Sequence, residues 1–125
     1  MFAEALLALA FLYMANYEEI RSRHGLAAAE AARAAMTDGV LAAREAGEIM
    51  GTAGGASLLV LIPHDGRIDR LWARARDLGH AADTAVPWHG DGVSAHPLIG
   101  IHVIRRGEAP GDIIWQAEQA ARRIV

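Results

Sequence analysis

Two residue types are missing from this chain of 125 residues, and each absence excludes a class of chemistry. There is no cysteine, so disulfide bonds, thiolate nucleophiles and cysteine-ligated zinc are excluded. There is no lysine either, because all 12 basic residues are arginine, so mechanisms that need a lysine amine are excluded as well.

What remains is the composition of a folded protein. Hydrophobic residues make up 53% of the chain and charged residues 22%, a balance that disordered chains do not have. A chain of 125 residues can bury one core but is too short for two, so we predict a single domain over residues 1–125.

The N-terminal segment MFAEALLALAFLYMANYEEI is rich in apolar residues. It carries Glu4 within the apolar run, lacks a basic residue before that run and is too short to span a bilayer. We therefore interpret it as part of the fold rather than as a signal peptide or an anchor. The expected protein is cytoplasmic and has no membrane partner.

Two continuous apolar runs predict strands. SLLVLIP at 57–63 follows GTAGGA, and LIGIHVI at 98–104 follows Pro97. Runs without polar alternation are typical of strands covered on both faces, as at the centre of an α/β sheet. A shorter candidate at 83–88 contains Pro87, which favours a sheet edge or a strand end.

Three segments have helical periodicity. Residues 65–80 repeat apolar side chains at helical steps, and Gly79 is the expected end of that helix. Residues 112–125 have Asp112 as an N-cap and arginines in the last turn. The stretch 26–50 carries a face made largely of small residues, which predicts a helix packed close to a neighbouring backbone or sheet.

Two points stay open at this level. Gly39 is costly inside a helix, so the alanine-rich helix is either continuous or restarts at 37–38. Residues 10–17, AFLYMANY, fit either a helix end or a strand, because periodicity does not separate the two over so short a run. With either choice, the order of elements predicts an α/β fold with helices on both faces of a sheet.

The alanine-rich segment and the order of elements resemble the type 2 peptidyl-tRNA hydrolase family. In that family a first strand leads into an alanine-rich helix that begins with glycine, and Gly25–Ala35 has a similar pattern of residues. The later features that match in order are the strand at 57–63, the helix end Ala-Arg-Asp-Leu-Gly at 75–79, the Asp-Gly loop at 91–92 and the strand at 98–104. The resemblance implies a small mixed, mostly parallel four-stranded sheet flanked by helices on both faces, with 10–17 as its first strand.

The same resemblance implies a cleft between the start of the alanine-rich helix and the Asp-Gly loop. The family's Lys, Gln and His positions are occupied here by Leu26, Glu30 and Arg33, and its loop Asp and Thr correspond to Asp91 and Ser94. Ester hydrolysis needs an activated water and a stabilised oxyanion, so Asp91 would orient water and Arg33 would stabilise the anion. The implied function is a hydrolase with an altered site, or one that has lost catalysis.

The loop WHGDGVSAHP concentrates polar side chains at this cleft. The residues assigned to the site are Asp91, Arg33 and Glu30 for catalysis, and Ser94, His96 and Trp88 for substrate binding. Histidine and aspartate suit zinc, but their spacing here matches no metal motif, and Ser94 lacks the constrained elbow of a nucleophilic serine. We expect no metal and no cofactor; a metal-dependent enzyme is the weaker alternative.

A second class of function stays open. The small helix face and the apolar N-terminus also suit close association, which predicts a non-catalytic module that dimerises or binds a protein. The partners to be distinguished are a tRNA-linked or other small ester or amide substrate, and a second copy of the chain in a homodimer.

Overall fold

The computed structural model describes residues 6–123. In chain order the elements are β1 (Leu6–Met14), α1 (Tyr17–His24), α2 (Leu26–Ala43), β2 (Ile49–Thr52), β3 (Ser57–His64), α3 (Ile68–Ala82), β4 (Ala85–Trp88), β5 (Asp91–Ser94), β6 (Pro97–Val103) and α4 (Pro110–Arg122). Among the helices of this range, none combines the length and the hydropathy that a bilayer crossing needs. Residues 1–5 of the N-terminal segment lie outside the described part.

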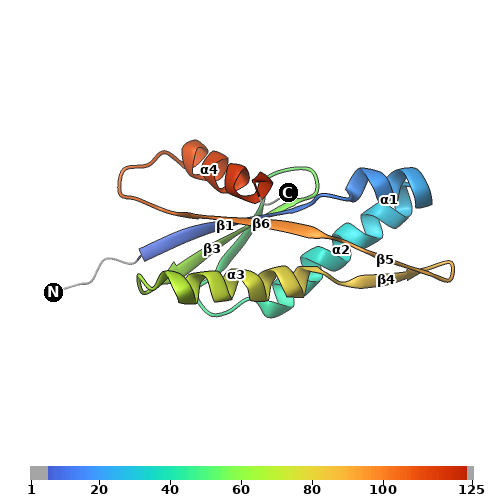
Figure 1. The fold of residues 1–125 in the computed structure, drawn as a ribbon, viewed down its shortest axis with the longest axis horizontal. Coiled ribbons are helices and arrows are strands. Elements are labelled where there is room, and N and C mark those ends of the chain that lie inside the picture. Colours follow the sequence, from blue (N-terminus) through green and yellow to red (C-terminus); the bar gives the residue numbers. More distant parts are fainter. Residues whose placement is uncertain (1–5, 124–125) are drawn as a thin grey trace.

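The main sheet has four strands in the order β2-β3-β1-β6 (Figure 1). Every neighbouring pair is antiparallel: β2 with β3, β3 with β1, and β1 with β6. The pairing of β1 settles the open question at 10–17, because this segment enters the sheet as its longest strand and is a strand as far as Met14. A separate hairpin of β4 and β5 extends beyond the end of the sheet.

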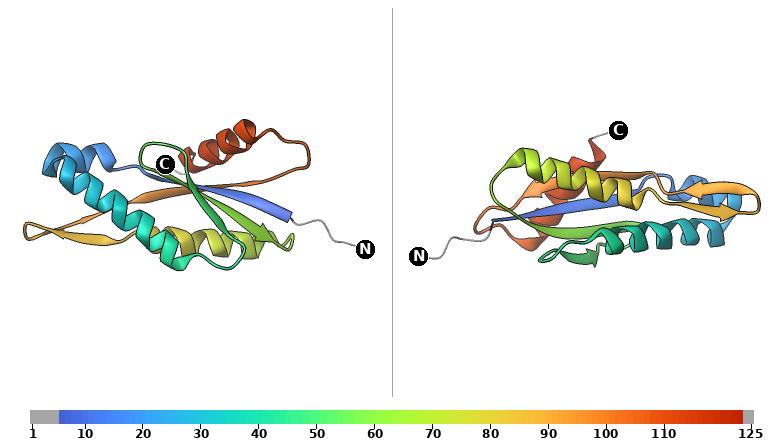
Figure 2. Two further views of the ribbon diagram at one scale, coloured as in Figure 1. Left: turned by 180° about the vertical axis from the view of Figure 1, so that it is seen from behind. Right: turned by 90° about the horizontal axis from the view of Figure 1, so that it is seen from below.

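The predicted mostly parallel sheet is therefore wrong. The prediction came from the family resemblance, and the unalternating apolar runs of β3 and β6, interpreted as strands covered on both faces, were compatible with it. Helices cover both faces of this antiparallel sheet, α2 and α3 on one side and α4 on the other (Figure 2). A strand between two helical layers needs apolar residues on both faces whatever its direction, so composition reports burial and not strand direction.

The alanine-rich helix α2 is continuous through Gly39 but ends at Ala43, short of the predicted 50. Residues 49–52 form β2 instead, an element that the sequence analysis missed. Gly39 is tolerated because α2 meets α3 there: a Cβ at this position would lie 2.1 Å from the carbonyl oxygen of Ala81. The close packing expected of this small-residue face is thus seen against a neighbouring helix. Its buried members are Ala28, Ala29, Ala32, Met36 and Val40.

Helix α3 runs through Gly79 and ends at Ala82, so the expected stop at Gly79 is wrong. Across the sheet, α4 is seated directly on β6. A Cβ at Gly100 would lie 2.0 Å from the backbone nitrogen of Ala121 and 2.6 Å from the carbonyl oxygen of Ala117. Ala117 and Ala121 are fully buried, so the contact between helix and strand is made almost backbone to backbone.

We predict that Gly100→Ala destabilises the fold by about 3 kcal/mol, because the added methyl group has no space and α4 must move off the sheet. Urea unfolding followed by circular dichroism measures the change. The matched control is Gly111→Ala at the start of α4, where no atom lies within 4 Å of the added carbon. The control is expected to be neutral or stabilising by up to about 1 kcal/mol; equal losses in both variants would contradict the close-approach argument.

Candidate functional site

The two predicted site residues of α2 engage one another. Arg33 Nε donates to Glu30 Oε2 one turn away, and both side chains are partly exposed. The guanidinium that was expected to stabilise an anion therefore already has a carboxylate partner on its own helix.

The predicted residues of the 88–97 loop lie on the β4–β5 hairpin and the segment that follows it. Asn16, between β1 and α1, holds this segment: its Nδ2 donates to the Ser94 carbonyl at 2.9 Å and its Oδ1 accepts from the His96 amide at 3.1 Å. Ser94 and His96 line a polar pocket of about 250 Å³ together with residues of α1 such as Arg23 and His24. Glu30 and Arg33 do not line that pocket.

Trp88 ends β4, where its backbone pairs with Asp91 at the start of β5. Its ring is half-buried and packs against the main core cluster, with an edge-on contact to His89 at 5.3 Å between ring centroids. The expected pocket-lining role of Trp88 and the cleft shared by Arg33 and Asp91 stay predictions. The roles of the six assigned residues in hydrolysis depend on the family resemblance.

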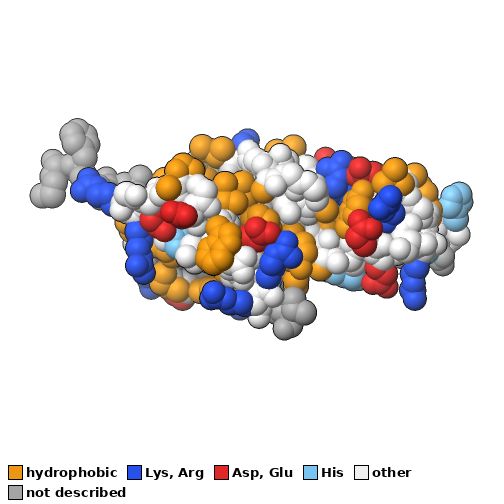
Figure 3. Space-filling view, turned by 90° about the horizontal axis from the view of Figure 1, so that it is seen from above, with side chains coloured by type: hydrophobic (Ala, Val, Ile, Leu, Met, Phe, Trp, Pro, Cys, Tyr) orange, Lys and Arg blue, Asp and Glu red, His pale blue; other side chains and the backbone are white. Residues whose placement is uncertain are grey.

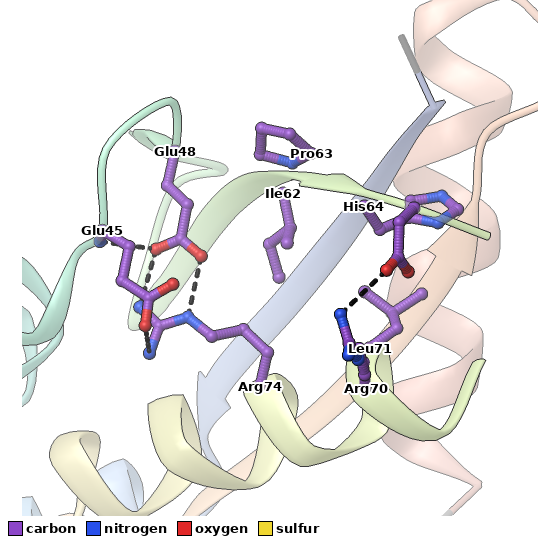
Figure 4. A pocket seen from close by; sticks show the side chains of 9 residues that line it. Glu45, Glu48, Ile62, Pro63, His64, Arg70, Leu71 and Arg74 are labelled. Atoms are coloured by element: carbon purple, nitrogen blue, oxygen red, sulfur yellow. Dashed lines mark hydrogen bonds and ion pairs between the residues drawn. The ribbon is translucent and has the colours of Figure 1, made fainter. Parts of the chain in front are cut away.

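The most strongly organised polar cluster lies beyond the C-terminal end of α2, where the chain leads into β2 (Figure 4). Arg74 on α3 makes a two-pronged contact with Glu48: Nε donates to Oε2 and Nη2 donates to Oε1, each at 2.7 Å. The same Nη2 donates to the carbonyl oxygen of Ala43 at 2.6 Å, and Nη1 lies 3.6 Å from Glu45 Oε1. The Glu48 side chain is 3% exposed and that of Arg74 13%, so this is a buried ion pair.

The environment keeps Glu48 ionised. Burial alone would raise the pKa of this carboxyl group. The hydrogen bonds from Arg74 and from the Glu45 amide, with the charges of Arg74 and Arg44, outweigh burial and lower the pKa below 4.5. The hydrogen bond to Glu48 raises the pKa of Arg74 in turn. Because each charge is satisfied by the other and by backbone groups, the pair fastens the α2–β2 loop to α3.

This cluster forms one wall of a pocket of about 390 Å³. The second arginine at the pocket, Arg70, pairs with Asp65 at 3.1 Å, so both lining guanidinium groups are neutralised by carboxylates. His64 also borders the pocket, but its ring is turned away from the Glu48–Arg74 pair (Figure 4). Within residues 6–123, no three His, Asp or Glu side chains are grouped so that they could hold a metal ion.

Neither Glu48 nor Arg74 was predicted as a functional residue. Glu48 lies inside the predicted helix 26–50, and Arg74 lies inside the predicted helix 65–80. A signal for Arg74 was present, because it follows Leu71 by three residues and precedes Leu78 by four, and both leucines are buried. Helical spacing alone puts Arg74 on the buried face, where an arginine needs a carboxylate partner.

A second feature joins the end of β1 to the turn between β2 and β3. Gly54 and Gly55 have φ of +84° and +57°, a conformation that favours glycine, and no atom lies within 4 Å of a Cβ at either position. The following residue, Ala56, accepts a hydrogen bond from the Met14 amide at 2.9 Å. The segment GTAGGA thus contains the last two residues of β2 and the turn that joins β2 to β3.

We predict that Glu48→Gln destabilises the protein by about 3 kcal/mol at pH 7, because the buried Arg74 then lacks a counter-charge. Chemical unfolding of both proteins measures the difference. The matched control is Glu45→Gln, which neutralises the 67% exposed carboxylate 3.6 Å from the same arginine and is expected to cost less than about 1 kcal/mol. A loss in the control as large as that in Glu48→Gln would contradict the assignment.

The pH dependence gives a separate prediction. The pKa of Glu48 is lower in the folded chain than its ordinary value of 4.5, so its contribution is complete above pH 4.5. That contribution is lost as the pH falls through the lower, folded pKa. We expect the stability of the wild type to fall more steeply than that of Glu48→Gln on acidification below pH 4.5. Parallel curves of stability against pH for the two proteins would contradict the lowered pKa of Glu48. Asp65 and Glu108, whose pKa values are also lowered, contribute equally to both curves.

Comparison with known proteins identifies the fold. No family model matches the sequence, and no curated protein matches it. Solved structures do match, and several of them are GGDEF-type proteins, of which three show the extent of the likeness. One is a sensory box/GGDEF family protein from Caulobacter crescentus CB15, with 19% identity, a TM-score of 0.81, and coverage of 95% of this chain and 78% of that one.

Another match is the diguanylate cyclase SiaD from Pseudomonas aeruginosa, solved in complex with its activator SiaC. It has 19% identity and a TM-score of 0.85, and the match covers 95% of this chain but only 47% of SiaD. The third is the GGDEF domain of DgcB from Caulobacter crescentus in complex with c-di-GMP, with 10% identity, a TM-score of 0.82, and coverage of 95% and 71%.

These matches overturn the peptidyl-tRNA hydrolase resemblance. The solved structures that share this fold are GGDEF-type proteins, and the sheet here is antiparallel. The hydrolase function and the tRNA-linked or small ester or amide substrates that the resemblance implied are therefore wrong. At these identities the likeness is one of fold. The fold of this chain is that of a GGDEF domain.

Proposed function

We propose that this chain is a GGDEF-like domain that does not synthesise cyclic di-GMP and that acts by binding a protein partner. One observation carries the proposal. Read as amino acids, the letters GGDEF are Gly-Gly-Asp-Glu-Phe, and the only Gly-Gly pair of this chain is followed by Ala56, Ser57 and Leu58. The pair lies in the tight β2–β3 turn, so the glycines are kept where the two carboxylates are not.

The surroundings of the turn do not replace those carboxylates. Making a cyclic dinucleotide from GTP is a phosphoryl transfer: a ribose 3′-hydroxyl attacks the α-phosphate of GTP and pyrophosphate leaves. Enzymes assist such transfers with Mg²⁺ held by carboxylate oxygens. The backbone partners of Ala56 and Ser57 are Tyr13, which pairs with Ser57 in the sheet, and Met14, whose amide donates to the carbonyl oxygen of Ala56. Neither side chain is a ligand for Mg²⁺, so this part of the chain does not fit a catalytic metal ion.

The pocket next to the buried ion pair gives no support to a nucleotide-binding role. A cyclic dinucleotide carries two phosphate charges and would need free cationic groups. Arg70 and Arg74, which line the pocket, are instead paired with Asp65 and Glu48. A protein partner is the better-supported alternative, since SiaD, which has the same fold, is described in complex with a protein activator.

The test is a synthesis assay with purified protein, GTP and either Mg²⁺ or Mn²⁺, with cyclic di-GMP measured by chromatography. We expect no product above the protein-free control under conditions in which an active GGDEF domain converts its substrate. Product that rises in proportion to the concentration of this protein would refute the non-catalytic proposal.

The double variant Ala56→Asp/Ser57→Glu makes the test sharper. It restores both carboxylates at the turn, yet we expect it to remain inactive because β1 supplies no further carboxylate beside them. Activity of the double variant alone would show that the turn is the only missing part, and that the proposed lack of a wider metal site is incorrect.

A further inference from the structure

An uncovered apolar strip runs along the half of the sheet that α4 does not reach. Across the sheet, Leu61 pairs with Ile49 on one side and with Leu9 on the other, so these side chains form one row on the α4 face. Leu9 is 7% exposed beneath α4, Leu61 is half-buried, and Ile49 is 62% exposed. Burial therefore falls steadily from β1 to the edge strand β2.

This strip is the floor of a groove of about 280 Å³ that has α4 as one wall. Figure 3, which looks onto the face that carries α4, shows hydrophobic side chains gathered there. All the residues that line the groove are apolar or glycine: Leu9, Ile49, Met50, Gly51, Leu59, Leu61, Ile104, Pro110, Ile113 and Ile114. A complementary surface must therefore be uncharged and aliphatic.

The composition of β3 indicates that a cover is missing. Leu58, Val60 and Ile62 point to the layer of α2 and α3 and are fully buried, whereas Leu59 and Leu61 point to the opposite face and are only half-buried. Apolar residues on both faces of a strand are typical of a strand that is covered on both faces. Here α4 covers β6 and β1, and the part of the face formed by β3 and β2 is left to another element.

The dimensions of the strip fit a single helix. Two neighbouring strands span about 10 Å, and an α-helix with its side chains is about 10 Å across. A second copy of this chain fits less well, because the four residues of β2 extend only about 13 Å. The strip measures roughly 13 Å by 10 Å, whereas each partner in a stable dimer buries about 800 Å² of accessible surface, so a second copy would need contacts well beyond the strip.

We propose that this groove binds an amphipathic helix of a partner protein, which lies beside α4 and covers β3 and β2. The helix presents aliphatic side chains at i, i+3 or i+4 and i+7 to Ile49, Leu59, Leu61 and Ile113, and directs its charged residues to solvent. This proposal rests on the binding role proposed above and names its partner chemistry; it does not depend on whether the domain makes cyclic di-GMP.

The probe is a synthetic amphipathic helical peptide of about 18 residues, roughly five turns, made of Leu, Ala, Lys and Glu. The control peptide has the same composition in an order that leaves no apolar face. Spectra of the protein labelled with ¹³C at Ile and Leu methyl groups are expected to change at Ile49, Leu59, Leu61 and Ile113 with the first peptide only. Fluorescence anisotropy gives the dissociation constants.

The variant Ile49→Glu places a charge in the groove and is expected to weaken peptide binding at least about tenfold. Its matched control, Leu41→Glu, changes a 52% exposed leucine of α2 on the other side of the molecule and is expected to bind as the wild type does. Circular dichroism checks that both variants fold. If Ile49→Glu does not fold, the changes in the methyl spectra of the wild type alone test whether the peptide binds in the groove.

Three outcomes would overturn the proposal. They are no binding of the amphipathic peptide, equal binding of both peptides, and equal affinity of Ile49→Glu and Leu41→Glu. Sedimentation supplies a fourth: a wild-type dimer that Ile49→Glu dissociates would show that the occupant is a second copy. Failure of this test leaves the synthesis assay unaffected, since that assay depends on the β2–β3 turn and not on the groove.

Discussion

The arrangement of this domain depends on the contact of α4 with β6 at Gly100. The backbone of the helix comes so close that no other residue fits there, and Ala117 and Ala121 complete the contact without bulk. A helix held this tightly over β6 and β1 cannot also cover β3 and β2. The same contact that fixes α4 therefore leaves the apolar groove open, and Gly39 plays the equivalent part between α2 and α3 on the other face. Small residues determine which surfaces are filled and which are exposed.

The buried ion pair acts on the same region from the other layer. Glu48 immediately precedes Ile49, the first residue of the edge strand, and its carboxylate is held by Arg74 on α3. Fixing Glu48 fixes the start of β2, which has only β3 as a neighbour in the sheet. A charge pair buried against one face of the domain thus helps to position β2, which forms the outer edge of the groove floor on the opposite face. Its lowered pKa keeps the pair charged at neutral pH, so this positioning does not vary with small changes in pH.

Parts of this fold are readable from the sequence because they depend on local pattern. The apolar run at 57–63 predicts β3, and the helical repeats predict α3 and α4. The sequence does not show which strands pair with one another, so the direction and the order of the strands could not be predicted from it. The family resemblance implied a mostly parallel sheet, which the structure does not have. Edge strand β2 was missed for a related reason. Four residues with a glycine have little strand character of their own, and Ile49 to Thr52 become a strand by pairing with β3.

The glycine turn and the apolar groove, on which the proposals rest, differ in how far the fold itself requires them. The turn at Gly54 and Gly55 demands glycine for its backbone conformation, so the fold preserves it whether or not Ala56 and Ser57 carry any chemistry. The groove has no such structural demand, because exposing Ile49 to water stabilises nothing in the isolated domain. A costly feature that the fold does not require is better evidence of function than a retained one that it does require. On that reasoning, the exposed apolar surface is stronger evidence for a role than the glycine turn is.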